Sequence, residues 1–129
     1  MYSGTVMEHF ISPQNIGHMF DADGVGRVGE PGCGDNCVIF IKIQEEAIDD
    51  IRVLIFGCGA AIACASMTTV LAKGCSIRNA LKISQLNIID ALDGLPETKQ
   101  HCSNLAVGAL QAAIGDYLRK QGKTIKDYL

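Results

Sequence analysis

The chain has 129 residues, a length that suits one domain with a single hydrophobic core over residues 1–129. Hydrophobic residues make up 48% of it and charged residues 19%, a composition that excludes intrinsic disorder. The net charge of −3, from 11 basic and 14 acidic residues, argues against a nucleic-acid-binding protein.

The first half of the sequence predicts a short helix followed by a β-hairpin. Residues 2–11 form an amphipathic pattern with Val6 and Phe10 on one side. Residues 12–32 hold five of the fourteen glycines, which indicates a loop with one short strand near Arg27. The apolar runs at 38–43 and 51–56 predict two antiparallel strands, joined by a polar turn over residues 44–50.

The second half predicts helices over residues 60–73, 77–82 and 85–92 and a long last helix that starts near Cys102. In the first of these, Ala63, Met67 and Val70 fall at inward spacing, and Leu71 joins them. Residues 53–72 carry no charge over the length of a membrane span, but a strand, a glycine turn and a helix account for them, so no membrane span is expected. Strands followed by helices predict an α+β domain, with helices on one face of an antiparallel sheet of about three strands.

The six cysteines are the most informative residues. Residues 1–10 include an acid and a histidine where a signal peptide has a basic end and an apolar run, so we expect a cytoplasmic protein with reduced thiols. Three of the cysteines fall at predicted element boundaries: Cys33, Cys58 and Cys102. Three thiolates together with a carboxylate or an imidazole suit zinc or an iron–sulfur cluster. The sequence has no C-x-x-C motif, so a zinc ribbon is not expected.

Two of these thiols are predicted to be acidic. Cys58 lies just before a predicted helix, and Cys102 lies in the first turn of another, beside His101 and near Lys99. The positive end of a helix and nearby cations favour the thiolate.

Three ordered motifs resemble those of the IscU/NifU-type iron–sulfur cluster assembly scaffolds, and the resemblance covers nearly the whole chain. They are Pro-Gly-Cys33-Gly-Asp35, Phe-Gly-Cys58-Gly-Ala-Ala-Ile-Ala and Lys99-Gln-His101-Cys102-Ser. The resemblance implies a scaffold, not an enzyme, that receives sulfur from a cysteine desulfurase together with iron. Such a scaffold builds a [2Fe-2S] cluster, with ferredoxin or another electron donor, and passes it to apo-proteins.

The same resemblance implies the site residues. Cys33, Cys58 and Cys102 would hold the cluster or a zinc ion, and Asp35 and His101 compete for the remaining place. Lys99 would support the pocket, Cys102 would accept the persulfide sulfur, and Asp35 would ease release of the cluster.

Two departures from the family pattern bear on the partners and the metal. Residues 95–99 read Leu-Pro-Glu-Thr-Lys where many bacterial members carry Leu-Pro-Pro-Val-Lys, so a specialised Hsp70 partner is not expected. The insertion of the zinc-dependent SufU branch is absent. A zinc-bound persulfide carrier and a structural zinc module remain alternatives because both use the same ligands, and a homo-oligomer is compatible with the sequence.

Three further cysteines lie outside the family motifs. Cys64, inside a predicted helix, is expected to fill the core, and Cys75, in a turn, to be a surface thiol. Cys37 shares a strand face with Cys33 and Asp35 if residues 33–39 run extended. We expect it to pack beside Ile39 as a small hydrophobe, with service as a reserve ligand as the alternative.

Overall fold

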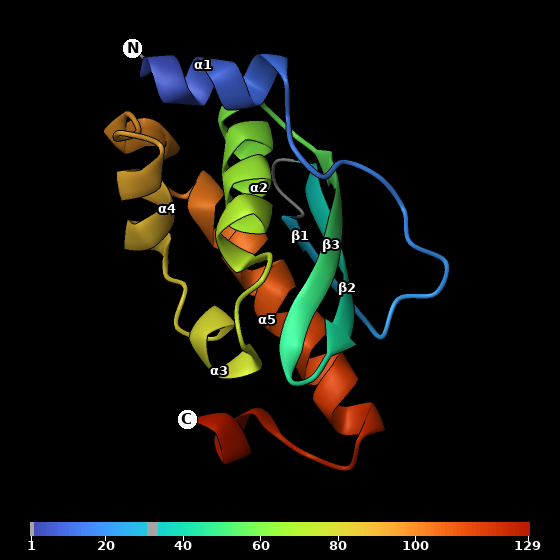
Figure 1. Ribbon diagram of the computed structural model, residues 1–129. Coiled ribbons are helices and arrows are strands. Elements are labelled where there is room, and N and C mark those ends of the chain that lie inside the picture. Colours follow the sequence, from blue (N-terminus) through green and yellow to red (C-terminus); the bar gives the residue numbers. More distant parts are fainter. Residues whose placement is uncertain (1, 31–33) are drawn as a thin grey trace.

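The computed structural model describes residues 2–30 and 34–129, and Figure 1 shows its course. The elements in chain order are α1 (Gly4–Ile11), β1 (Gly24–Glu30), β2 (Asp35–Gln44), β3 (Ala47–Phe56), α2 (Gly59–Ala72), α3 (Ile77–Ala80), α4 (Gln85–Ala91), a 3₁₀ turn (Glu97–Lys99), α5 (Cys102–Lys120) and a second 3₁₀ turn (Ile125–Tyr128). The strands form one antiparallel sheet in the order β1-β2-β3.

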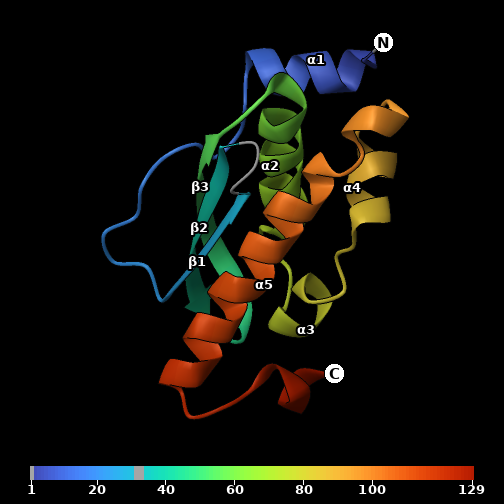
Figure 2. The ribbon, with the colours of Figure 1, turned by 180° about the vertical axis from the view of Figure 1, so that it is seen from behind.

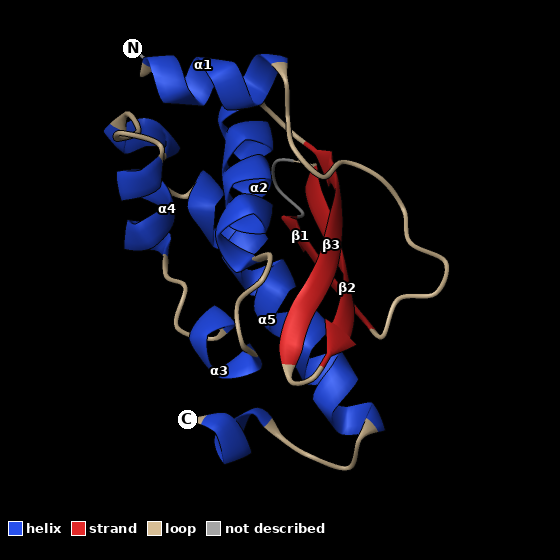
Figure 3. Cartoon of the chain, in the orientation of Figure 1, coloured by secondary structure: helices blue, strands red, loops and turns tan. Residues whose placement is uncertain are grey.

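The helices form a layer on one face of the sheet, as Figure 3 shows, which confirms the predicted α+β class. α5 runs along β1 and β2, a contact visible from behind in Figure 2, and α2 packs on β3 and α5. α1 lies across the end of α2, and α4 flanks both long helices. Within the described residues, no helix is both long and apolar enough to cross a membrane.

Strand β1 is longer than the sequence predicted. Its seven residues lie in the segment that its glycines marked as mostly loop, and they pair with β2 from Gly24↔Ile41 to Glu30↔Asp35. The glycines serve packing: a Cβ at Gly26 would collide with the carbonyl oxygen of Ala109 on α5. Tertiary packing therefore overrides the weak local strand propensity of glycine.

The β2–β3 turn is tighter than predicted. Only Glu45 and Glu46 form it, both in the left-handed region with φ of 53° and 63°, a conformation typical of two-residue hairpin turns. The predicted turn over residues 44–50 was too long, because β3 already starts at Ala47 and buries Ile48 completely.

The two faces of β2 are both covered, which explains its unbroken apolar run. Cys37, Ile39 and Ile41 are fully buried against the helix layer. Val38 and Phe40 face the other way, and the ring of His18, from the segment that precedes β1, lies 4.6 Å from that of Phe40. The segment over residues 12–23 therefore covers the far face of the sheet.

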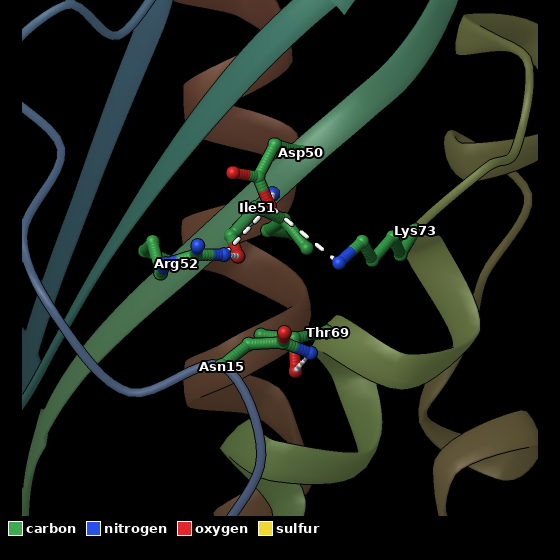
Figure 4. A network of polar contacts seen from close by, with 6 residues as sticks. All are labelled: Asn15, Asp50, Ile51, Arg52, Thr69 and Lys73. Atoms are coloured by element: carbon green, nitrogen blue, oxygen red, sulfur yellow. Dashed lines mark hydrogen bonds and ion pairs between the residues drawn. The ribbon is translucent and has the colours of Figure 1, made fainter.

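Polar contacts hold this segment to β3 and α2. Figure 4 shows the contact between Asn15 and Thr69, and the contacts of Asp50 nearby. The amide of Asn15 donates to Thr69 Oγ1 at 3.0 Å, and the backbone N–H of Val53 donates to the carbonyl of Asn15 at 2.8 Å. Nearby, Asp50 pairs with Arg52 at 2.6 Å and with Lys73 at 3.7 Å. Burial alone would raise the pKa of the Asp50 carboxyl, but its hydrogen bonds and these cations lower it.

Helix α2 is buried on nearly every side because α1, α4, α5 and β3 all contact it. Ala63 and Met67 point inward as predicted. Val70, which was predicted to do the same, is 44% exposed and lines a surface hollow beside Glu8 and His9 of α1.

Candidate thiol site

Two cysteines from distant parts of the chain meet where the N-termini of α2 and α5 come together. Cys58 is the extended N-cap residue of α2, and Cys102 is the first residue of α5. Their Sγ atoms lie 3.8 Å apart, and both thiols are free. The pair is too far apart for a disulfide and close enough to bind one metal ion or one edge of a cluster.

Asp35 brings a carboxylate to the same place from the sheet. It is the first residue of β2, next to the pair Asn36↔Phe56 at the end of β3. A Cβ at Gly57 would lie 3.0 Å from Oδ1 of Asp35, so the carboxylate rests against the backbone that leads into Cys58. The predicted grouping of Asp35 with Cys58 and Cys102 is consistent with this geometry.

His101 and Lys99 border the pair from the segment before α5. Nε2 of His101 lies 3.8 Å from Sγ of Cys102, and the imidazole is exposed. Lys99 ends the 3₁₀ turn before α5, and its positive charge acts to lower the pKa of Cys102. Both residues lie where an approaching partner could contact them.

The Cys102 thiol is not acidic, and the prediction that it would be is wrong for the protein without metal. Burial raises its pKa to about 12, and the hydrogen bond and charge of Cys58, together with the carboxylate of Asp35, act in the same direction. The positive charge of Lys99 lowers the pKa of Cys102, but by less than the other effects raise it. Cys102 is also only 4% exposed, so desolvation outweighs the field of the helix N-terminus.

The third predicted thiol, Cys33, lies outside the described residues. Within residues 2–30 and 34–129, no group of three or more histidine, cysteine, aspartate or glutamate side chains is arranged to hold a metal ion. The ligand set of Cys33, Asp35, Cys58, His101 and Cys102 therefore stays a prediction. Its four described members, Asp35, Cys58, His101 and Cys102, lie near one another.

Sequence reasoning missed that Cys64 belongs to the surroundings of the pair. Cys64 is fully buried in α2, as expected of a core residue, in the same apolar cluster as Cys102 with Cys58 packed against it. Burial raises the pKa of its thiol to about 12, with added effects of Cys102 and Cys58. No local signal in the sequence indicated this, because residues six apart do not share a helix face.

Phe10 lies beside the start of α2, and Phe56 is close to Cys58 in sequence. The Phe10 ring lies 3.3 Å from where a Cβ would stand on Gly59, so α1 packs on the start of α2 beside Cys58. Phe56, two residues before Cys58, is 76% exposed. A single exposed aromatic side chain is ordinary on a protein surface, so Phe56 by itself marks no interface.

The other two extra cysteines are placed by the structure as follows. Cys37 packs beside Ile39 with no exposure, as expected, and burial raises the pKa of its thiol to about 12. Cys75 is only half-buried, and its thiol donates to the carbonyl of Leu71 at 3.1 Å while packing on the core. Cys75 was predicted to be a surface thiol, and the structure gives it a free thiol of intermediate exposure that also packs on the core.

The sequence matches a known family over nearly its whole length. The family described as NifU-like N terminal domain matches residues 1–124. "Iron-sulfur cluster assembly scaffold protein IscU 1" of Archaeoglobus fulgidus is 54% identical over 126 residues, which cover 98% of this chain and 82% of that protein. The IscU scaffold protein of Escherichia coli is 42% identical over 93% of this chain and 96% of its own length.

Solved structures agree on the fold. The N-terminal part of a nitrogen-fixing NifU-like protein from Brucella abortus has a TM-score of 0.72 at 16% identity, and covers 92% of this chain and 94% of that one. A candidate scaffold protein for the SUF system from Fervidobacterium islandicum has a TM-score of 0.73 at 18% identity, over 88% and 96% of the two chains. At such identities the likeness concerns the fold alone.

Proposed function

Because this chain belongs to the NifU-like N-terminal domain family, we propose that it is a scaffold that assembles an iron–sulfur cluster and passes it to apo-proteins. Relatives with 42–54% identity carry the name of such scaffolds. The observation that supports the proposal best is the 3.8 Å approach of Cys58 and Cys102, with Asp35 against the adjoining backbone. Two soft sulfur ligands and one hard, exchangeable oxygen ligand suit a cargo that must be both held and released.

In this proposal a cysteine desulfurase supplies sulfur to Cys102. The Cys102 thiolate attacks the outer sulfur of the desulfurase persulfide, whose S–S bond breaks, and the desulfurase cysteine leaves as a thiolate that takes up the proton lost from Cys102. No electrons are gained or lost overall. Because Cys102 is 4% exposed, this step needs its thiol to become accessible when the desulfurase binds.

The cargo is a [2Fe-2S] cluster held by Cys33, Cys58 and Cys102, with either Asp35 or His101 in the remaining place. Nε2 of His101 is 3.8 Å from Sγ of Cys102, and Asp35 lies against Gly57, the residue before Cys58, so each lies close to one member of the thiol pair. Lys99 would balance the negative charge of the thiolates. Ferredoxin or another electron donor would supply electrons, in the cytoplasm.

Anaerobic assembly tests the proposal. The metal-free protein is incubated with ferrous iron, cysteine and a cysteine desulfurase, and iron, zinc and acid-labile sulfide are measured with the absorption spectrum. We expect visible charge-transfer bands, iron and sulfide in near-equal amounts, and transfer of the cluster to an apo-ferredoxin. One colourless zinc ion with faster sulfide release by the desulfurase would instead indicate a zinc-bound sulfur carrier. Zinc with no effect on the desulfurase would indicate a structural zinc module.

A further inference from the structure

A groove lies on the outer side of α5, away from the thiol pair. Its larger part, of about 790 Å³, runs between α5 and the C-terminal segment around Ile125. A second hollow of about 390 Å³ lies against the connection between α3 and α4. Gly108 and Gln111 line both, so the two hollows adjoin along the helix, and together they are called the groove.

The floor of the groove has the form of a helix-docking surface. Gly108, Ala112 and Gly115 follow one another at spacings of four and three residues and so lie on one side of α5. A Cβ at Gly108 would meet Val28 of β1 at 3.3 Å and one at Gly115 would meet Ile125 at 3.5 Å, so the two glycines already make room for these side chains. Ala112, which is exposed, forms the open part of the floor. Ile125 and Ile83 add apolar walls on the two sides.

The rim of the groove is positively charged although the chain as a whole carries a net charge of −3. Arg119, Lys123 and Lys126 line the larger part and Lys82 the smaller, and no carboxylate is among the described residues that line either. Arg119 and Lys123 already pair with carboxylates of this chain, Asp116 at 2.7 Å and Glu46 at 3.8 Å, whereas Lys82 and Lys126 form no ion pair among the described residues. The rim therefore suits further carboxylates along an incoming segment.

We propose that this groove docks an acidic amphipathic helix of a partner protein, with small apolar residues on the floor and carboxylates against the rim. A nucleic acid or an anionic membrane would use the cations but would leave the apolar, small-residue floor unused. The groove reaches Asn104, two residues from Cys102, but Asn104 and Ala112 are exposed whereas Cys102 is buried, so the groove and the thiol pair lie on different sides of α5. A helix in the groove would therefore leave the thiol pair open to exchange.

A designed peptide of about 18 residues tests the groove. One side of the peptide carries alanine and leucine and its flanks carry glutamate; a matched version carries lysine instead. We expect saturable binding of the fluorescent glutamate peptide to the full chain in fluorescence anisotropy, weakened by added salt, and no binding of the lysine peptide. Backbone amide shifts in NMR spectra should move along residues 108–119 and not at Gly57.

Variants separate the groove from general charge effects. Ala112→Tyr fills the floor at an exposed position, and Lys126→Glu reverses one rim charge; each should weaken peptide binding about tenfold. Arg27→Glu, an equal charge change at an exposed β1 residue outside the groove, should leave affinity within about twofold. Absence of saturable binding, or unchanged affinity in Ala112→Tyr, would overturn the proposal. Binding of phosphatidylglycerol vesicles or single-stranded RNA that Lys126→Glu abolishes and Ala112→Tyr preserves would assign the cations to those ligands and overturn it as well.

Discussion

Sγ of Cys58 and Sγ of Cys102 lie 3.8 Å apart although 44 positions of sequence separate the two residues. The contact exists because each thiol occupies the start of a helix, and α2 and α5 pack together beside the sheet. Cys58 is half-buried and Cys102 almost fully buried, so the two thiols differ in access while sharing one place.

We predict that Cys58→Ser and Cys102→Ser each abolish stable cluster binding. A neutral hydroxyl is a poor substitute for a thiolate at iron, and the remaining cysteine of the pair cannot bind that part of the cluster alone. Absorption spectra and iron and sulfide analysis after anaerobic assembly measure the loss. Cys75→Ser is the matched control, because Cys75 packs on the core by its hydrogen bond to Leu71 and should keep the cluster. A full cluster spectrum in either site variant would refute the ligand assignment.

Asp35→Ala should hold its cluster longer in air than the parent protein. A carboxylate is a hard, exchangeable ligand among thiolates, and its removal closes the route by which water or an acceptor thiol reaches iron. The decay of the visible bands measures the lifetime. Asp90→Ala, an exposed carboxylate on α4, serves as the control. An unchanged or shortened lifetime would argue against a role of Asp35 in release.

Alkylation of the reduced, metal-free native protein should modify Cys58 well before Cys102, Cys37 and Cys64. At pH 8 a thiol with a pKa of about 12 is ionised in roughly one molecule in ten thousand, and these three thiols are also buried. Peptide mass spectrometry after timed iodoacetamide treatment gives the order. Rapid modification of Cys37 would contradict its packing role and favour the reserve-ligand alternative.

Gly26→Ala should destabilise the fold by about 3 kcal/mol, because the new Cβ meets the backbone of α5 at Ala109 and Ala113 and forces the helix off the sheet. Urea denaturation measures the free energy of unfolding. Gly4→Ala is the matched control: its Cβ would meet nothing within 4 Å, so the change should stay within about 0.5 kcal/mol of the parent. Equal stabilities of the two variants would show that β1 and α5 can separate at little cost.

Asp116 should stabilise the fold in a pH-dependent way. Burial would raise the pKa of its carboxyl, but the N–H of Val25 and the charges of Lys120 and Arg119 outweigh it and lower the pKa. The stabilisation is therefore present above the unfolded-state pKa of about 3.9 and is lost as pH falls through the lower folded-state pKa.

We accordingly expect Asp116→Asn to lose about 1 kcal/mol at pH 7, and the difference from the parent protein to shrink below about pH 4. Urea denaturation at several pH values measures both. A difference that stays constant down to pH 3 would show that the charge of Asp116 is not the cause.

The sequence by itself determined those features that depend on local periodicity. The 3.6-residue pattern after Cys102 marked α5, and the β-branched run over residues 38–43 marked β2, because each pattern has one solution that buries its apolar side. The thiols at Cys58 and Cys102 were likewise placed at element starts.

Only the tertiary structure decided the extent of β1 and the pKa of Cys102, because both depend on segments that are distant in the sequence. Gly24 and Gly26 are poor strand formers taken alone, yet they lie in β1 because α5 needs the space that their missing side chains leave. The pKa of Cys102 depends on burial and on Cys58 and Asp35, none of which local sequence reveals, so a thiol that its helix position marked as acidic is neutral. How deeply a side chain is buried and which groups it contacts depend on how the whole core packs. Sequence periodicity therefore predicts the helices and strands, but it does not predict the pKa of a thiol that lies between them.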